Sequence, residues 1–208
     1  MTIRKNENWG TIVTRPKNLV ICASDAATSQ LITEHYVQKQ IFPAIAIVTS
    51  NLARALGSNG ADANAQNMQA TPFDLIEIAF TDDSNREQVV LALGYGLLRK
   101  SWWRSEIVAA MNTSFISDWD CAPRSHPNDG KFDLVTVRKE MSPTQRLIAL
   151  RRLRLATHLP HPQISVKQLT SFDADCSTEP NLYVDDRRFS RVKRCKFSLI
   201  PDAITLYW

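Results

Sequence analysis

The sequence predicts a short α/β segment followed by a longer β-rich segment, and three observations indicate this division. A buried-strand pattern followed by a helical pattern occurs twice near the N-terminus, over residues 18–40 and 44–57. Residues 58–67 are polar and have no periodicity, which is typical of a boundary. From residue 73 onward, several segments alternate apolar with polar side chains, as β-strands do. The predicted domains are therefore residues 1–67 and 68–208.

In the first segment we expect a strand at residues 18–22, a small-residue turn at 23–29 and a helix at 30–40. A second strand is expected at 44–48, followed by a capped helical turn at 50–56 that ends at Gly57. This order implies parallel strands whose loops meet at one end of the sheet, where α/β folds place their ligands.

In the second segment, a rigid loop at residues 119–130 contains two prolines and an Asn-Asp-Gly turn and leads into a strand. Ser142 followed by Pro143 is typical of a helix start and predicts an amphipathic helix to about residue 157. Strands are expected at residues 73–80, 88–93, 106–111, 132–137, 164–169, 181–184, 192–200 and 203–207.

The composition sets few limits on function. The 208 residues carry a net charge of +4 and a pI near 9.0, which suits contact with anionic phosphate or membrane surfaces and also many proteins that contact neither. The cysteines are scattered and predict neither a metal cluster nor a disulfide framework: Cys22, Cys121, Cys176 and Cys195. No apolar run approaches the ~18 residues that a spanning helix needs. We expect a cytoplasmic protein that contacts a membrane only at its surface.

Several motifs follow one another between residue 70 and the C-terminus. They are Ala122-Pro123, then Asn128-Asp129-Gly130 before an apolar strand, then residues 158–162 after a basic helix, then residues 183–186 and 200–206. In order, spacing and turn chemistry they resemble the C-terminal domain of the diacylglycerol kinase and lipid kinase superfamily. That superfamily includes sphingosine and ceramide kinases and is distantly related to NAD kinase. The resemblance implies an abbreviated α/β nucleotide-type lobe and a β-sandwich-like C-terminal lobe with one amphipathic helix.

The first segment resembles the same family with its phosphate-binding chemistry removed. Active members carry Gly-Gly-Asp-Gly-Thr after a buried strand, because only glycine lets backbone amides approach nucleotide phosphates there. A second family motif falls on residues 45–51, where its glycine has become Ile47. The resemblance also implies a strand–helix unit ahead of residue 18, for which only residues 1–17 remain. By this resemblance, the candidate residues for ATP and Mg²⁺ are Ala23, Ser24, Asp25, Ala26, Ala27, Thr28, Thr49 and Ser50. The alternative for Asp25 is a helix cap.

The family's proton acceptor is the glutamate of an Asp-Gly-Glu turn. Here Asp185 matches the aspartate, Asp186 the glycine and Arg187 the glutamate. A guanidinium stays protonated and cannot act as a base. Asp185 and Asp186 are therefore the candidate catalytic residues, although extended backbone would direct the Asp186 side chain to the opposite side. The alternative is an acidic turn paired with Arg187 and Arg188.

Asp129 matches the family's structural metal-associated aspartate, flanked by His126 and Lys131 where family members offer backbone oxygens. These three residues form the candidate metal site. The alternative is an Asp-Gly turn that caps a strand.

Three basic stretches suit contact with an anionic lipid surface: residues 99–104 with Trp102 and Trp103, the helix bearing Arg146, Arg151, Arg152 and Arg154, and residues 187–196. Buried tryptophans and a solvated helix face are the alternatives. No recognisable motif supports nucleic-acid binding.

The family reaction is ATP-dependent phosphorylation of a lipid hydroxyl. Because the glycine loop, the acceptor glutamate and the N-terminal unit all depart from the family pattern, we expect weak or no activity with retained lipid or nucleotide binding. One alternative is a non-catalytic scaffold or interaction subunit that keeps only the fold. Another is an active kinase whose short N-terminal lobe is completed by a partner protein or a second copy.

Overall fold

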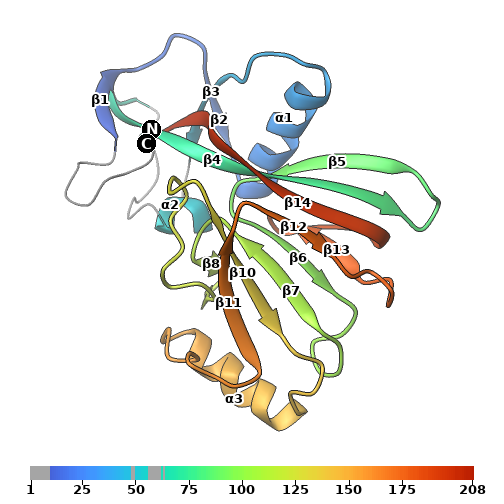
Figure 1. The fold of residues 1–208 in the computed structure, drawn as a ribbon. Helices are drawn as coiled ribbons and strands as arrows, with labels where there is room; N and C mark the ends of the chain where they lie inside the picture. The colour runs from blue at the N-terminus through green and yellow to red at the C-terminus, as the bar shows by residue number, and fades with distance from the viewer. Residues whose placement is uncertain (1–9, 48–49, 56–61, 63) are drawn as a thin grey trace.

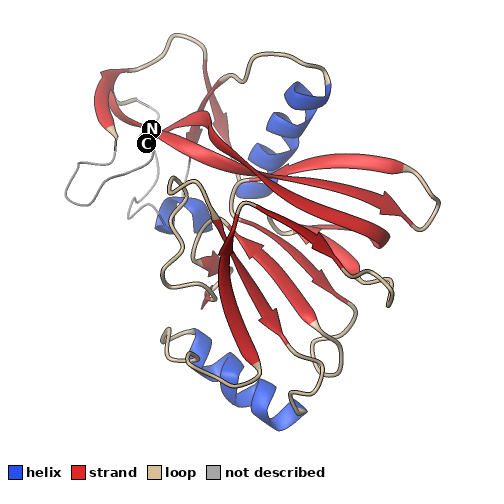
Figure 2. Ribbon diagram, viewed as in Figure 1, coloured by secondary structure: helices blue, strands red, loops and turns tan. Residues whose placement is uncertain are grey.

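A computed structural model describes residues 10–47, 50–55, 62 and 64–208. The molecule is built mainly from β-strands, most of them antiparallel and joined in one twelve-stranded sheet. This sheet folds into two layers, with few helices around it (Figure 2). The predicted β-rich character is therefore confirmed, while the division into two lobes stays a prediction.

The N-terminal elements include a parallel strand–helix–strand unit. They are β1 (Thr11–Thr14), β2 (Leu19–Cys22), α1 (Asp25–Val37), β3 (Ala44–Ile47) and α2 (Asn51–Ala55). β2 and β3 pair in parallel, as the sequence predicts. However, α1 begins at Asp25 and not at residue 30, so the predicted turn at 23–29 is wrong. Ser24 caps the helix by accepting a bond from the Ala27 amide at 3.2 Å, and the alanines that follow favour helix.

Two long antiparallel strands form the centre of the upper layer in Figure 1, β4 (Asn67–Asp82) and β14 (Arg187–Tyr207). β14 is a single strand with a register shift between Ile200 and Ile204, where the sequence predicts two strands. Its end also pairs in parallel with β3, Leu206 opposite Ile45, so the C-terminus completes the N-terminal sheet. Residues before and after position 67 share one core cluster. The domain boundary at 67 stays a prediction.

β13 (Asn181–Val184) pairs with β14 and with the second layer, which continues as β6 (Tyr95–Arg99), β7 (Ile107–Met111), β10 (Phe132–Val137) and β11 (Ile164–Leu169). The remaining strands are β5 (Glu87–Ala92), β8 (Phe115–Ile116), β9 (Trp119–Asp120) and β12 (Ser171–Ala174). The structure confirms β10, β11 and β13 at the predicted bounds. β1, β6, β8, β9 and β12 are additional to the prediction.

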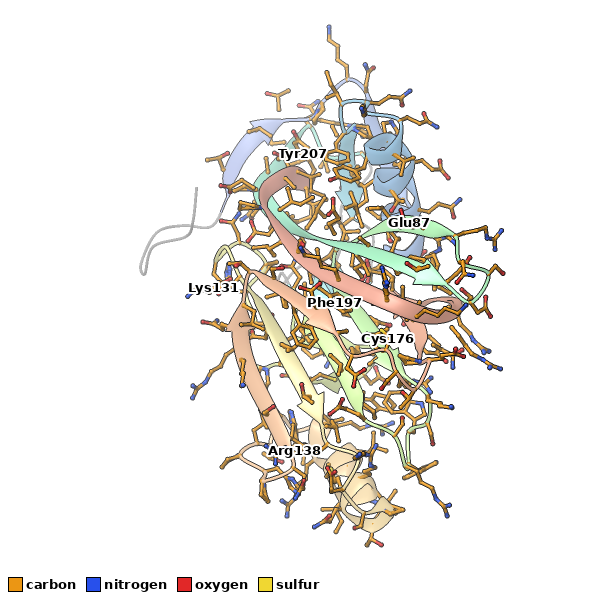
Figure 3. All side chains as sticks on the ribbon, turned by 45° about the vertical axis from the view of Figure 1, so that its right-hand side comes forward. Glu87, Lys131, Arg138, Cys176, Phe197 and Tyr207 are labelled. Atoms are coloured by element: carbon orange, nitrogen blue, oxygen red, sulfur yellow. The ribbon has the colours of Figure 1, made fainter. Side chains whose placement is uncertain are left out.

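The main core lies between the layers, where Ile78 and Phe197 from one layer pack with Leu98 and Phe132 from the other. Figure 3 shows Phe197 near the middle of the molecule. α3 (Pro143–Leu153) lies at the end of the molecule remote from α1 (Figure 1). It begins with the predicted Ser142 cap but ends at Leu153, earlier than expected. Within the described ranges, no helix combines the length and apolar character needed to cross a membrane.

Candidate functional site

Asp25 connects the two N-terminal helices. It lies in the first turn of α1, and its Oδ2 accepts a hydrogen bond from the Leu52 amide of α2 at 3.1 Å. The Ser50 side chain also bonds to this carboxylate. Burial raises the pKa of Asp25, and the nearby Asp186 carboxylate raises it further. The prediction that Asp25 caps its own helix is wrong, because Ser24 occupies that position and Asp25 bonds the start of α2.

Asp185 is a buried anchor in the turn between β13 and β14. Oδ2 accepts from the Leu93 amide at 2.7 Å, and Oδ1 accepts from the Gly94 and Tyr95 amides, both at 2.9 Å. The three hydrogen bonds favour the charged carboxylate and lower its pKa. Burial has the larger effect and raises the pKa of Asp185 to about 7. These contacts hold the β5–β6 connection to the turn. Such hydrogen bonds are typical of a residue that stabilises the fold, and a catalytic role for Asp185 stays a prediction.

Asp186 is the exposed carboxylate of the cluster. Its Oδ1 accepts a bond from the Tyr95 hydroxyl at 2.8 Å, and its amide donates to the same hydroxyl at 3.0 Å. Asp185 and Asp186 have φ values of 44° and 67°, as the centre of a type I′ hairpin turn requires. The backbone is therefore not extended here, and the expectation that Asp186 points to the opposite side is wrong. The charge of Asp186 also raises the pKa of Asp25, so the two carboxylates influence each other through space.

The arginines after the turn do not pair with its two aspartates. The Arg187 guanidinium lies 5.0 Å from the Phe189 ring centroid, and an Arg188 nitrogen donates to Asn181 Oδ1 at 3.3 Å. Within the described part of the chain, neither arginine forms an ion pair with Asp185 or Asp186. The predicted pairing of this acidic turn with its arginines is therefore wrong.

The remaining loop residues use their polar groups locally. Thr28 is buried and its hydroxyl donates to the Ser24 carbonyl at 3.0 Å, while Ser50 Oγ accepts from the Ala53 amide at 3.1 Å. Ala23, Ala26 and Ala27 surround this helix start and contribute no polar side-chain atom. Thr49 lies outside the described residues. Nucleotide binding by these residues stays a prediction.

Three further residues of this site were not predicted from sequence: Tyr95, Asn112 and Thr113. Asn112 is fully buried, and its Nδ2 donates to the carbonyls of Asp74 and Leu93, both at 2.8 Å. Among the described residues, Asn112 Oδ1 and Thr113 Oγ1 are buried without a hydrogen-bond partner. A Cβ at Gly94 would lie 3.1 Å from Asp185 Oδ1, so a side chain there would require the Asp185 carboxylate to shift slightly. The Gly-Tyr-Gly interruption of an apolar run was the available signal.

The site offers few ligands for a metal ion. In the ranges that the structure describes, no group of three or more His, Cys, Asp or Glu side chains is placed to hold one. Mg²⁺ usually takes one or two carboxylates and completes its shell with water and substrate phosphates. Asp25 and Asp186 fit that limited contribution, so they suit Mg²⁺ that arrives with a nucleotide.

The predicted metal site at Asp129 lies in the loop before β10. Asp129 Oδ1 accepts from the Lys131 amide at 3.0 Å and Oδ2 from Gln168 Nε2 at 3.3 Å. The His126 ring nitrogen Nδ1 accepts from the Asn128 amide at 3.3 Å, and burial lowers the pKa of this imidazole. These bonds are consistent with the Asp-Gly turn alternative. Metal binding by Asp129, His126 and Lys131 stays a prediction.

A partly open apolar pocket of about 80 Å³ lies between α3 and the second layer. Its lining includes Trp102, Val135, Leu153 and His158. His158 Nε2 lies 3.2 Å from the Cys121 carbonyl, while Nδ1 is buried without a described partner. Burial lowers the pKa of His158, so the ring is neutral at pH 7. Among the described residues that line this apolar pocket, only His158 carries a buried polar atom without a hydrogen-bond partner.

The arrangement of strands in this chain is that of the diacylglycerol kinase fold. A Bacillus anthracis str. Sterne crystal structure described as a "putative diacylglycerol kinase" matches with a TM-score of 0.60 and 13% identity, over 91% of this chain and 77% of that chain. A second structure from the same organism, described as a diacylglycerol kinase, has a TM-score of 0.51 and 12% identity, over 91% and 75%. At these identities the likeness defines the fold. No protein-family model matches the sequence, and no curated protein does.

Proposed function

We propose that this protein is a diacylglycerol kinase-like protein that retains lipid or nucleotide binding but has weak or no phosphoryl-transfer activity. The observation that carries the proposal is that the charge of Asp186 raises the pKa of Asp25, although the two residues come from segments far apart in sequence. An exposed carboxylate beside a half-buried one suits a nucleotide whose phosphates carry Mg²⁺. The fold likeness supports the class of ligand.

The proposed loss of activity rests on three features of the site. Ser24 bonds the Ala27 amide, so this N-terminal amide of α1 is not available to a phosphate. Asp185, which matches the family's turn aspartate, bonds three backbone amides. Arg187 takes the position of the acceptor glutamate and packs on Phe189. Asp186 is left as the accessible base, and Tyr95 orients it.

The pocket under α3 supports lipid as one ligand. Its lining is apolar and suits part of an acyl chain. We place the ATP and Mg²⁺ contacts at Asp25 and Asp186 and the lipid contacts near α3. A cytoplasmic location with contact at a membrane surface belongs to the same proposal.

Turnover of γ-labelled ATP with diacylglycerol or sphingoid substrates tests the proposal. We expect a rate close to that of the reaction without protein. A substantial rate that Asp25→Ala or Asp186→Ala abolishes would show that the site is an active kinase. In that case a size measurement that finds an oligomer would favour completion of the short N-terminal lobe by a second copy or a partner.

The second candidate is a non-catalytic scaffold or interaction subunit. This second candidate is favoured by the hydrogen bonds of the Asp185 carboxylate and of the Ser24 hydroxyl to backbone amides. Both sets of bonds stabilise the fold without a ligand. Thermal-shift measurements with ATP–Mg²⁺, ADP and anionic liposomes separate the two functions. A shift with any of them favours retained binding, and no shift with all three favours the scaffold.

A further inference from the structure

A second, more open pocket of about 720 Å³ lies at the edge strand β11. It is bounded by the loop between β9 and β10, the loop between α3 and β11, and the strands β10 and β11. Pro123, Leu159 and Pro160 give it apolar walls, and Val166 adds an apolar side chain that is 37% exposed. Its volume is in the range of small-molecule sites, which combine apolar walls with a few polar groups. We call it the β11 pocket.

The floor of the β11 pocket contains a buried carboxylate. Asp133 of β10 is 5% exposed and lies on the face of the sheet opposite Phe132 and Leu134, which belong to the main core. Gln168 is its direct cross-strand neighbour on β11, and Val166 projects from the same face. Both line the pocket together with Asp133, so the carboxylate is directed toward it.

Asp133 receives fewer hydrogen bonds than a buried carboxylate usually does. The Ser125 side chain bonds to it, but the same hydroxyl also lies 3.2 Å from the Met111 carbonyl and has one proton to donate. Among the described residues, no basic side chain forms an ion pair with Asp133. A buried aspartate is normally paired, and a carboxylate accepts about four hydrogen bonds. Acceptor capacity therefore remains for a ligand in the pocket.

The β11 pocket also carries a cation that does not neutralise this carboxylate. Arg124 is exposed in the loop before β10 and lines the same pocket. In the part of the chain that the structure describes, it forms an ion pair neither with Asp133 nor with another acidic residue. The charge of Asp129 acts on Asp133 through space and makes that side more negative. The pocket therefore presents a negative group and a separate positive group between apolar walls.

We propose that the β11 pocket binds a free α-amino acid with an apolar side chain. The ammonium group of the ligand pairs with Asp133, and its carboxylate pairs with Arg124. Arginine suits this role because its planar guanidinium binds a carboxylate through two parallel hydrogen bonds. The side chain of the ligand lies against Pro123, Leu159 and Val166. No residue of the carboxylate site lines this pocket, and the proposal does not rest on the proposed function.

Calorimetric titration of the full chain with L-leucine tests the proposal. Two analogues each lack one charge: isoamylamine has no carboxylate, and 4-methylpentanoate has no ammonium group. Leucine is expected to bind saturably, and each analogue at least about tenfold more weakly, because each loses a charge-assisted hydrogen-bonded pair. Glycine keeps both charges without an apolar side chain and is expected to bind on the order of tenfold more weakly than leucine.

Two substitutions assign the charges. Asp133→Asn keeps the shape of the side chain, and it is expected to weaken leucine binding at least about tenfold while leaving 4-methylpentanoate binding unchanged. Arg124→Gln is expected to weaken leucine binding similarly while leaving isoamylamine binding unchanged. Asp173→Asn and Arg194→Gln remove like charges outside this pocket and are expected to bind leucine as the parent does.

Thermal unfolding of the variants separates binding from folding. Asp133→Asn is expected to unfold at the parent's temperature or above it, because the substitution removes a buried charge without an ion-pair partner. Arg124 is exposed, so Arg124→Gln tests the proposal without disturbing the core.

Absence of leucine binding at millimolar concentration would overturn the proposal, as would binding that both substitutions leave unchanged. Isoamylamine that binds as tightly as leucine would overturn it in favour of an organic cation, and 4-methylpentanoate that binds as tightly would overturn it in favour of an anion. Asp186→Ala is expected to bind leucine as the parent does. A failure of the carboxylate site and a failure of the β11 pocket are therefore distinguishable.

Discussion

The two neighbouring aspartates of the β13–β14 turn have different environments. Asp185 is buried on three amides, whereas Asp186 is exposed and bonds the Tyr95 hydroxyl through both its side chain and its amide. This difference depends on the positive φ values of the turn. A sequence window of Val-Asp-Asp-Arg predicts the acidic pair but not which carboxylate is accessible, because that follows from the strand that the turn meets.

Tyr95→Phe tests whether the hydroxyl positions Asp186. The change removes two hydrogen bonds from a buried ring, so we expect the free energy of unfolding to fall by about 1–2 kcal/mol in urea titrations. Tyr207→Phe is the control, since its hydroxyl forms no hydrogen bond with any residue that the structure describes, and it is expected to change stability by less than about 0.5 kcal/mol. Equal effects of the two substitutions would exclude a positioning role.

The burial of His158 predicts that the free energy of unfolding depends on pH. Burial lowers its pKa in the folded protein, so between that value and the ordinary value of about 6.5 the unfolded chain binds more protons. Its contribution to stability is therefore present above about pH 6.5 and is lost as the pH falls below it. The difference in unfolding free energy between the parent and His158→Phe, measured from neutral to mildly acidic pH, is expected to shift in favour of the variant. A difference that stays constant with pH would contradict this assignment.

At the scale of elements, helix starts show what local sequence can predict. The Ser142-Pro143 pair predicts the start of α3, because the cap and its Gln145 partner lie within one turn. The start of α1 was missed, since Ser24 and the small residues after it are equally typical of a turn. β6 was also missed, because Gly94 and Gly96 interrupt its apolar pattern. A Cβ at Gly94 would crowd Asp185, and one at Gly96 would clash with Ile78 and Phe197, all of which are distant in sequence.

Arg146 is the element-scale test of how α3 is held. It is 3% exposed and donates to four carbonyls. Arg146→Met leaves these acceptors without their donor, so we expect a loss of about 3 kcal/mol or more in unfolding free energy and faster proteolysis near α3. Arg152→Ala, on the exposed side, is expected to change stability by less than about 0.5 kcal/mol. A mild effect of Arg146→Met would show that apolar packing alone holds the helix.

At the scale of the molecule, β14 joins the two parts that the sequence separates. It pairs with β4 along most of its length and with β3 at its end. Periodicity predicts a strand in this region but not its partners, because pairing across so much intervening chain depends on the whole fold. The order of motifs toward the C-terminus nevertheless indicated the kinase fold, and the solved structures confirm that fold.

Calorimetric titration with ATP, with and without Mg²⁺, tests the central claim most directly. Because the site presents carboxylates, we expect saturable binding of ATP with Mg²⁺, little binding of ATP alone, and loss of binding in Asp186→Ala. The Lys193→Ala/Arg194→Ala variant, altered away from the site, is expected to bind like the parent. Absence of binding under all conditions, or binding that depends on neither Mg²⁺ nor Asp186, would contradict the assignment of a retained nucleotide site to these carboxylates.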